Sequence, residues 1–463
     1  MRHSVRHDHP AYCQARGSPV AADTVPMSVR HDAVSGLWTL SAPPGTMGAP
    51  VVSADRVYLP VDGRVTALDR ATGRVLWQTP HRVEFHSDYV SAVFAVGEHL
   101  VVPDALAYMT KGDMISFAVL SAATGGLCWS REPELVSGYS AHGRTLVFWR
   151  LDQEERGTIT AVDLATGGLR WRLDLDALRA VLPTDDRVVA STAAEGKREV
   201  RAYDLCSGEQ VWRSEEHGWP ESLRLSERGP SAEPVVLAWN WLGKQLRWFS
   251  PATGERLGSL VVRPRISFYS SDDPLVRADG ESLWLTTNDQ RRIDRLRPFA
   301  ARLRTRTFTP LPRRLAHSSP EFVEAAGWLY AMAHPAFERR DTPWEERRGT
   351  LVVAARVNRP GRYRRLTPVR WPEAVPRGER EVMWGELAAG RNHAYVHGWH
   401  RDGTGRTIAL RGNRVLWRRE GRPCLAVPVD DQVLLVDTGT EHDRLSLIDG
   451  ETGACAGPPA ERN

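Results

Sequence analysis

A short hairpin pattern recurs along the chain, and its period constrains the fold more than any other feature of the sequence. In the clearest copy, Val65 to Trp77, alternating apolar residues lead into an Asp-x-x-Thr-Gly turn, and a second stretch follows that ends in Trp. The glycines of five successive turns, at positions 73, 125, 167, 208 and 254, are separated by 52, 42, 41 and 46 residues. This spacing is typical of four-stranded blades and excludes coiled-coil and most helical repeats.

Each residue type of the pattern has a structural role. Asp and Thr side chains can bond to turn amides, and Gly adopts the positive φ that a tight hairpin needs. Trp fills space between neighbouring sheets. The residues assigned to these roles are Asp69, Thr72, Gly73, Trp77, Thr124, Gly125, Trp129, Asp163, Thr166, Gly167, Trp171, Asp204, Gly208, Trp212, Thr253, Gly254, Trp417, Asp449, Thr452 and Gly453.

A second hairpin pattern precedes several of these copies, as at residues 49–60 and 182–189. Two hairpins per period predict a blade of four strands. With the weak candidates at 295–299 and 356–361 included, the chain contains nine repeat hairpins.

The pattern resembles the pyrroloquinoline-quinone-like propeller repeat, in which Ala-Leu-Asp, a turn with Thr-Gly and a hydrophobic stretch ending in Trp follow one another. The resemblance is strong over residues 49–260, fades between 270 and 370, and recovers over 390–456. It implies an all-β fold with a single β-propeller over residues 35–460. Because the family usually closes at eight blades, we predict eight, with seven to nine possible.

The two ends of the repeat region are incomplete in complementary ways. The last copy, at residues 448–453, lacks its Trp strand, whereas residues 35–40 near the N-terminus contain Trp38 without a hairpin. Pairing of these N- and C-terminal strands would close the ring and remove an exposed sheet edge.

Residues 1–34 are predicted to be a disordered or mis-called extension. Ser-Val-Arg-His-Asp at positions 4–8 is repeated at 28–32, directly after Met27. A true start at Met1 and one at Met27 both remain open, and we expect disorder in either case.

Composition indicates a folded, cytoplasmic protein. Hydrophobic residues make up 41% of the chain, which is enough for a proper core, and no apolar run is long enough to span a membrane. Residues 1–29 contain no apolar run of the kind found in signal peptides. The five cysteines are far apart and form no CxxC pair, which argues against a disulfide framework or a structural zinc site.

No catalytic, cofactor-binding or metal-binding residue is assigned. The family that this chain resembles includes quinoprotein dehydrogenases. The adjacent cysteines and calcium ligands expected of such enzymes are not recognisable in this sequence, so we expect no cofactor. His393 and His397 would share one face of a strand and His400 the other, too few converging ligands for a metal. Ser140 and His142 lack the Gly-x-Ser-x-Gly spacing of a nucleophile elbow, and we interpret residues 138–143 as a turn between blade strands.

A local excess of arginine is the main candidate for partner binding. It coincides with the most degenerate repeats and with a long segment at 334–349, where binding loops are expected. An acidic protein is the favoured partner of these residues, and solvated outer strands are the structural alternative. The paired arginines are Arg291, Arg292, Arg313, Arg314, Arg339, Arg340, Arg347, Arg348, Arg364 and Arg365.

These observations favour a non-catalytic scaffold, a monomeric ring that presents loops or its central channel to a protein or small ligand. Fold alone does not give function. One alternative is an enzyme with a site at the channel mouth, either a degenerate quinoprotein or a hydrolase or lyase. A second alternative is binding of nucleic acid or another polyanion through the arginine-rich region 291–370.

Overall fold

The computed structural model contains only strands, turns and connections in the part of the chain that it describes. The described residues are 27–32, 37–79, 93–109, 112–151, 156–194, 197–216, 222–226, 234–240, 245–261, 275–276, 282–288, 296–302, 307–310, 322–333, 351–356, 363–366, 384–399, 405–421, 423–438 and 441–455. Within these ranges, we find no helix with the length and apolar character that a bilayer crossing requires.

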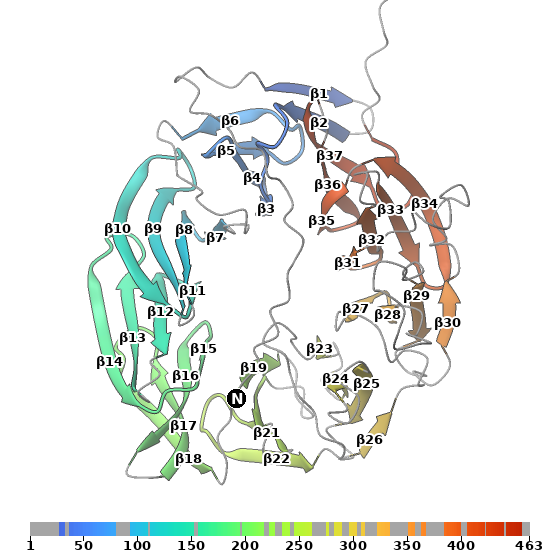
Figure 1. Cartoon of the computed structure of the whole chain (residues 1–463). Coiled ribbons are helices and arrows are strands. Elements are labelled where there is room, and N and C mark those ends of the chain that lie inside the picture. The colour runs from blue at the N-terminus through green and yellow to red at the C-terminus, as the bar shows by residue number, and fades with distance from the viewer. Residues whose placement is uncertain are drawn as a thin grey trace, which may run out of the picture.

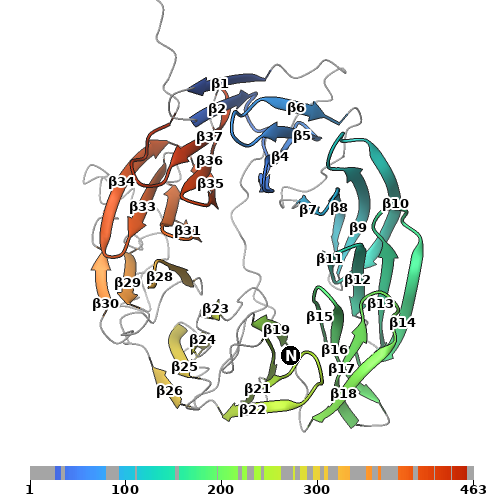
Figure 2. The same cartoon turned by 180° about the vertical axis from the view of Figure 1, so that it is seen from behind.

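The strands form sheets that stand around a common axis, as Figures 1 and 2 show from opposite sides. The first strand of each sheet lies nearest the axis, except in the sheet that joins the chain ends, where β35 is innermost and β1 outermost. We call the sheets blades A to I. Blade A contains β1 (Ser28–Asp32), β2 (Leu37–Ala42), β37 (Asp443–Asp449), β36 (Gln432–Asp437) and β35 (Pro423–Val429). Blade B contains β3 (Val51–Val52), β4 (Arg56–Val61), β5 (Arg64–Asp69) and β6 (Val75–Gln78). Blade C contains β7 (Phe94–Val96), β8 (His99–Met109), β9 (Gly112–Ser121) and β10 (Leu127–Val136).

Blades D to F continue the ring in chain order. Blade D contains β11 (Gly138–His142), β12 (Thr145–Leu151), β13 (Arg156–Asp163) and β14 (Leu169–Asp176). Blade E contains β15 (Ala180–Pro183), β16 (Arg187–Ala194), β17 (Lys197–Asp204) and β18 (Gln210–Glu216). Blade F contains β19 (Ser222–Ser226), β20 (Val235–Asn240), β21 (Gln245–Phe249) and β22 (Arg256–Val261).

Blades G to I complete the ring. Blade G contains β23 (Leu275–Val276), β24 (Ser282–Asn288), β25 (Leu296–Arg302) and β26 (Thr307–Pro310). Blade H contains β27 (Phe322–Ala325), β28 (Trp328–Ala333), β29 (Leu351–Arg356) and β30 (Tyr363–Leu366). Blade I contains β31 (Trp384–Ala389), β32 (Ala394–Trp399), β33 (Gly405–Arg411) and β34 (Arg414–Gly421).

The predicted all-β propeller of four-stranded blades is confirmed. The described residues form nine sheets, one more than the preferred count of eight and within the predicted range of seven to nine. The degenerate stretch between residues 270 and 370 supplies blades G and H. Strand pairing there needs only backbone hydrogen bonds and alternation, so blades form without the turn signature.

The ring closes through its chain ends, as predicted. In blade A, β2 pairs antiparallel with β37, placing Thr39 opposite Ser446. The buried Asp443 adds a polar contact, because its Oδ2 accepts hydrogen bonds from the amides of Thr46 at 2.9 Å and Met47 at 3.1 Å. Strands from the two ends of the chain therefore share one sheet.

The extension assigned to residues 1–34 requires a correction at its C-terminal end. Residues 28–32 form β1, which pairs with β2 along its whole length and adds a fifth strand to blade A. Met27 and Val29 pack against the apolar cluster between blades A and B, so burial stabilises this segment. Residues 1–26 lie outside the described residues.

The hydrophobic core is divided into clusters, and the described residues form one at each of the seams A–B, B–C, C–D, D–E, E–F, H–I and I–A. The cluster between blades D and E, for example, joins Val147 and Ile159 of blade D to Val188 and Tyr203 of blade E. Alternate residues of each strand point to opposite seams, so a blade is apolar on both faces. Burial of apolar side chains between neighbouring blades is therefore the main source of stability of the ring.

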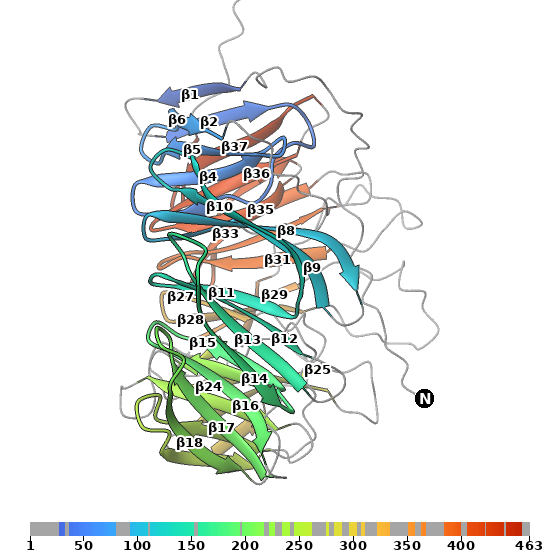
Figure 3. The ribbon, with the colours of Figure 1, turned by 90° about the vertical axis from the view of Figure 1, so that its left-hand side faces the viewer.

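The two faces of the ring carry different connections. Because strands alternate in direction, the repeat turns and the turns between the first and second strands lie on one face. Connections between the second and third strands lie on the other. The hairpin of β8 and β9 projects on this second face (Figure 3).

Candidate functional site

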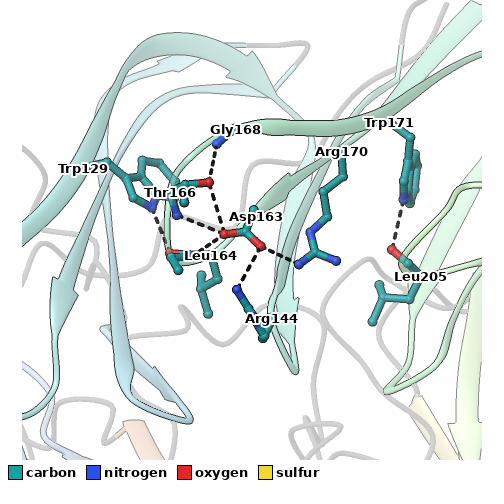
Figure 4. Close-up of polar contacts among 10 residues, drawn as sticks. Trp129, Arg144, Asp163, Leu164, Thr166, Gly168, Arg170, Trp171 and Leu205 are labelled. Carbon is teal, nitrogen blue, oxygen red and sulfur yellow. Dashed lines mark hydrogen bonds and ion pairs between the residues drawn. The ribbon is translucent and has the colours of Figure 1, made fainter.

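The repeat turn is a compact hydrogen-bonded unit, shown for blade D in Figure 4. Asp163 Oδ1 accepts bonds from the Thr166 amide at 3.0 Å and the Thr166 hydroxyl at 3.2 Å. The Gly167 amide donates to the Asp163 carbonyl at 2.8 Å. On the other carboxylate oxygen, Arg170 Nη2 lies at 2.5 Å and Arg144 Nη2 at 3.7 Å. The same Asp-centred turn recurs at Asp69, Asp204 and Asp449.

In six of the blades, a Trp docks on the turn of the following blade. Its indole Nε1 donates to a backbone carbonyl there, and its ring lies over the turn glycine. The Nε1–O pairs are Trp38–Arg70 at 2.8 Å, Trp77–Ala122 at 3.2 Å, Trp129–Leu164 at 2.8 Å, Trp171–Leu205 at 3.0 Å, Trp212–Pro251 at 2.8 Å and Trp417–Gly450 at 2.9 Å. Because Trp38 docks on blade B, the N-terminal strand supplies the indole that the last repeat lacks.

The assigned turn residues take their predicted places, with two variations. The copies with Thr124 and Thr253 use Ser121 and Ser250 in place of Asp, and their glycines still bond to the carbonyls of these serines. Blade F has Gly258 at the position that Trp occupies in blades B to E, and Trp248 from the neighbouring strand occupies that space. A Cβ on Gly258 would lie 2.3 Å from Trp248 Cζ2.

The turn aspartates link the fold to pH. Hydrogen bonds from Arg170 and then Thr166 lower the pKa of the Asp163 carboxyl. The stabilisation from Asp163 is therefore complete above its unfolded-state pKa of about 3.9 and is lost as the pH falls through the lower folded-state value. We expect Asp163→Asn to lose less stability than the wild type between about pH 6 and pH 2.5. Urea midpoints measured across this range check the prediction.

The control for this prediction is Asp174→Asn, on the same blade. The Asp174 side chain is 74% exposed, and its Oδ1 lies 3.4 Å from Arg172 Nε on the same strand. Its profile should run parallel to that of the wild type. Parallel profiles for Asp163→Asn and the wild type would show that the turn network contributes no pH dependence.

The arginine patch lies almost entirely outside the described residues. Arg364 and Arg365 belong to β30, the outermost strand of blade H. Arg291, Arg292, Arg313, Arg314, Arg339, Arg340, Arg347 and Arg348 fall outside the described ranges. Partner binding through this patch therefore stays a prediction.

Two of the three histidines in the stretch 393–400 lie in the described part of the chain. His393 precedes β32 and His397 lies within it, both with buried side chains, whereas His400 is outside the described residues. His393 Nε2 contacts Glu451 Oε2 at 3.0 Å, and this bond, with help from Arg411, lowers the pKa of Glu451. The described residues contain no group of three or more His, Cys, Asp or Glu arranged to hold a metal ion.

Ser140 and His142 form an arrangement that sequence reasoning missed. Both residues belong to β11, and Ser140 Oγ lies 2.8 Å from His142 Nε2. His142 Nδ1 lies 3.1 Å from Asp185 Oδ1, which comes from the turn between β15 and β16 of blade E. The expectation of a turn over residues 138–143 was wrong for most of its length, because residues 138–142 form β11 and the turn is confined to Gly143 and Arg144. The contact with Asp185 was not foreseen either. Its 43-residue separation leaves no local signal.

Comparisons with known proteins place these features in a wider group. A family model described as outer membrane protein assembly factor BamB matches residues 28–148 and 115–272. A comparison with curated protein sequences yields no match. Among solved structures, a eukaryotic initiation factor superposes with a TM-score of 0.50 at 10% identity, covering 86% of this chain and 97% of that one.

Two further structures are similar at lower TM-scores. BamB from Moraxella catarrhalis has a TM-score of 0.41 at 13% identity, covering 91% of this chain and 97% of its own. A quinohemoprotein alcohol dehydrogenase from Pseudomonas putida HK5 has a TM-score of 0.46 at 14% identity, covering 91% and 76%. At such identities these likenesses concern the fold alone.

Proposed function

This chain belongs to the pyrroloquinoline-quinone-like β-propeller repeat family, and on that premise we propose that it is a binding platform. In this role the rigid ring holds a protein or small-ligand partner on its loops or at its central channel. The role requires no turnover and no cofactor. We place it in the cytoplasm, on the sequence argument from the scattered cysteines, and we propose that the ring acts as a monomer.

The observation that carries the proposal is how the repeated polar residues are used. In each Asp-centred turn the carboxylate bonds to its own turn, and the docked indoles bond to the next blade. These residues build the ring and leave it stiff, which suits a scaffold that presents variable loops.

We propose that the partner is an acidic protein held through the arginine-rich region 291–370. Arginine forms charge-assisted, bidentate hydrogen bonds with carboxylates, which gives such a region specificity as well as attraction. The family match ends at residue 272, so this region lies outside the part of the chain that the family model matches.

The test uses the full chain as bait in extracts of its own cells, with quantitative mass spectrometry of what is retained. One variant changes Arg339, Arg340, Arg347 and Arg348 to Glu. The matched control changes four exposed arginines of blades D and E to Glu, namely Arg150, Arg156, Arg172 and Arg213. We expect one acidic protein at near-equal stoichiometry, lost in the first variant and kept in the control. Equal capture by both variants would contradict the proposed surface.

Two assays address the competing functions. Filter binding to DNA and RNA at about 50 and 200 mM salt tests the polyanion alternative, because several phosphate contacts imply a steep loss of affinity. Dye reduction after addition of pyrroloquinoline quinone, calcium and simple alcohols tests the quinoprotein alternative. A positive result in the second assay would replace the platform with an oxidoreductase.

A further inference from the structure

The contact of Ser140, His142 and Asp185 lies at the seam between blades D and E. The first strands of these blades, β11 and β15, both line the inner side of the ring (Figure 1). Ser140 and His142 are two residues apart on β11 and therefore point to the same face. Val147, which pairs with Ser140 across β11 and β12, belongs to the apolar cluster between blades D and E. The serine and the histidine therefore face this seam.

The local sequence explains how the array is held in place. His142 and Thr145 close a two-residue turn in which Gly143 has a φ of 56°, as a type II′ hairpin requires. The turn fixes the end of β11, and with it the direction of the His142 side chain. Asp185 reaches the imidazole from the corresponding turn of the next blade.

The propeller repeat does not need polar residues at these positions. Three other blades also have a two-residue turn after their innermost strand, and there the places of Ser140 and His142 are taken by apolar residues. These pairs are Phe94 and Val96 in blade C, Val323 and Ala325 in blade H, and Val427 and Val429 in blade A. The polar pair in blade D is therefore an addition to the scaffold.

The hydrogen-bond roles follow from the chemistry of the three groups. An ionised carboxylate only accepts, so the contact with Asp185 Oδ1 requires the proton of a neutral imidazole to be on Nδ1. His142 Nε2 then carries the lone pair and accepts the Ser140 hydroxyl proton. The His142 side chain is 23% exposed and Asp185 is fully exposed, so the array is open to solvent at the repeat-turn face.

We propose that Ser140 is an activated nucleophile that cleaves carboxylic esters, with His142 as its general base and Asp185 as the group that orients the imidazole. Ser140 Oγ forms a bond to the ester carbonyl carbon while its proton passes to His142 Nε2. The bond to the alcohol oxygen then breaks, and this oxygen takes the proton from His142. The product is an alcohol and an acyl-serine.

Water completes the cycle. A water molecule attacks the acyl carbonyl carbon and gives a proton to His142 Nε2. The bond to Ser140 Oγ breaks as this oxygen takes the proton back, and the carboxylic acid leaves. The solvated Asp185 carboxylate acts through a high dielectric, which favours esters with good leaving groups over amides.

The strand geometry offers a donor for the negative charge that develops on the carbonyl oxygen. His142 and Thr145 close the hairpin as a hydrogen-bonded pair, so the pair of Ala141 and Leu146 is not hydrogen-bonded. The Ala141 amide therefore points toward the inner edge of the sheet, where β11 is the terminal strand. It belongs to the residue directly after the nucleophile and is the candidate oxyanion donor.

The test is covalent labelling of the full chain with a fluorophosphonate probe, followed by peptide mass spectrometry, together with hydrolysis of p-nitrophenyl acetate. We expect the label on Ser140 and none there in Ser140→Ala. His142→Gln should slow labelling by about 100-fold, the usual worth of a general base. Asp185→Asn should slow it less, because that carboxylate is solvated. Ser130→Ala, which removes an exposed hydroxyl of blade C, should leave both rates unchanged.

Urea midpoints of all the variants separate chemistry from folding. A purely structural seam contact would change the midpoints of His142→Gln and Asp185→Asn without any selective reaction at Ser140. Labelling spread over exposed serines, or labelling of Ser140 at an undiminished rate in a folded His142→Gln protein, would overturn the proposal. Neither assay requires a partner. A negative result for Ser140 would therefore contradict the esterase proposal and would leave the proposal of a binding platform unaffected.

Discussion

Replacing Gly208 with alanine is expected to lower the free energy of unfolding by about 2–4 kcal/mol, measured by urea denaturation. Two costs add at this position. Gly208 has a φ of 72°, which costs an L-residue about 1–2 kcal/mol. A Cβ would also lie 2.7 Å from Trp171 Cγ, so the docked indole would have to move out of its packed position.

The matched control is Gly97→Ala. Gly97 has a φ of 57°, and a Cβ there would meet nothing within 4 Å. This variant pays the backbone cost alone, and we expect a loss of about 1 kcal/mol. Equal losses for Gly97→Ala and Gly208→Ala would show that indole docking does not depend on the bare glycine.

Replacing Trp38 with alanine is expected to cost about 3–5 kcal/mol and to loosen the ring at its closure. The Trp38 side chain is fully buried between blades A and B, and its Nε1 bonds to the Arg70 carbonyl at 2.8 Å. It is the docking residue of β2, the N-terminal strand that pairs with β37. Hydrogen exchange should therefore become faster in β1, β2 and β37, in addition to the loss of stability.

Trp171→Ala separates closure from docking as such. Trp171 makes the equivalent contact on blade E, with Nε1 3.0 Å from the Leu205 carbonyl. Blades D and E, however, are each formed by one continuous stretch of the chain. We expect a similar loss of stability with no selective increase of exchange in β1, β2 and β37. If both variants gave the same exchange pattern, the chain ends would have no special part in holding the ring.

The number of blades could be predicted only partly from the repeat pattern. Nine hairpin candidates are visible in the sequence. The preference for eight blades came from the usual blade number of the family rather than from the residues. The weak candidate at 295–299 overlaps β25, the third strand of blade G, and the one at 356–361 begins at the last residue of β29, the third strand of blade H. Residues 357–361 lie outside the described part of the chain. The turn signature of both candidates has decayed, but a strand keeps its pairing as long as its alternation survives.

The contact of Ser140, His142 and Asp185 could not be predicted from the sequence. Ser140 and His142 were visible as neighbours in the sequence, but without the spacing of a known motif they pointed to a turn. Asp185 lies in a different blade, and its role depends on how two blades meet. A contact of this kind has no periodic signal, because it arises from rigid-body placement of two sheets.

The sequence by itself determined the all-β class, the four-stranded blade, the turn chemistry and the joining of the chain ends. Those features depend on interactions within a few residues, such as Asp163 with Thr166, or on a pattern that recurs along the chain. Only the tertiary structure decided that the described residues form nine blades and that Asp185 meets His142. The angle between neighbouring blades sets both, and that angle results from packing across every seam at once.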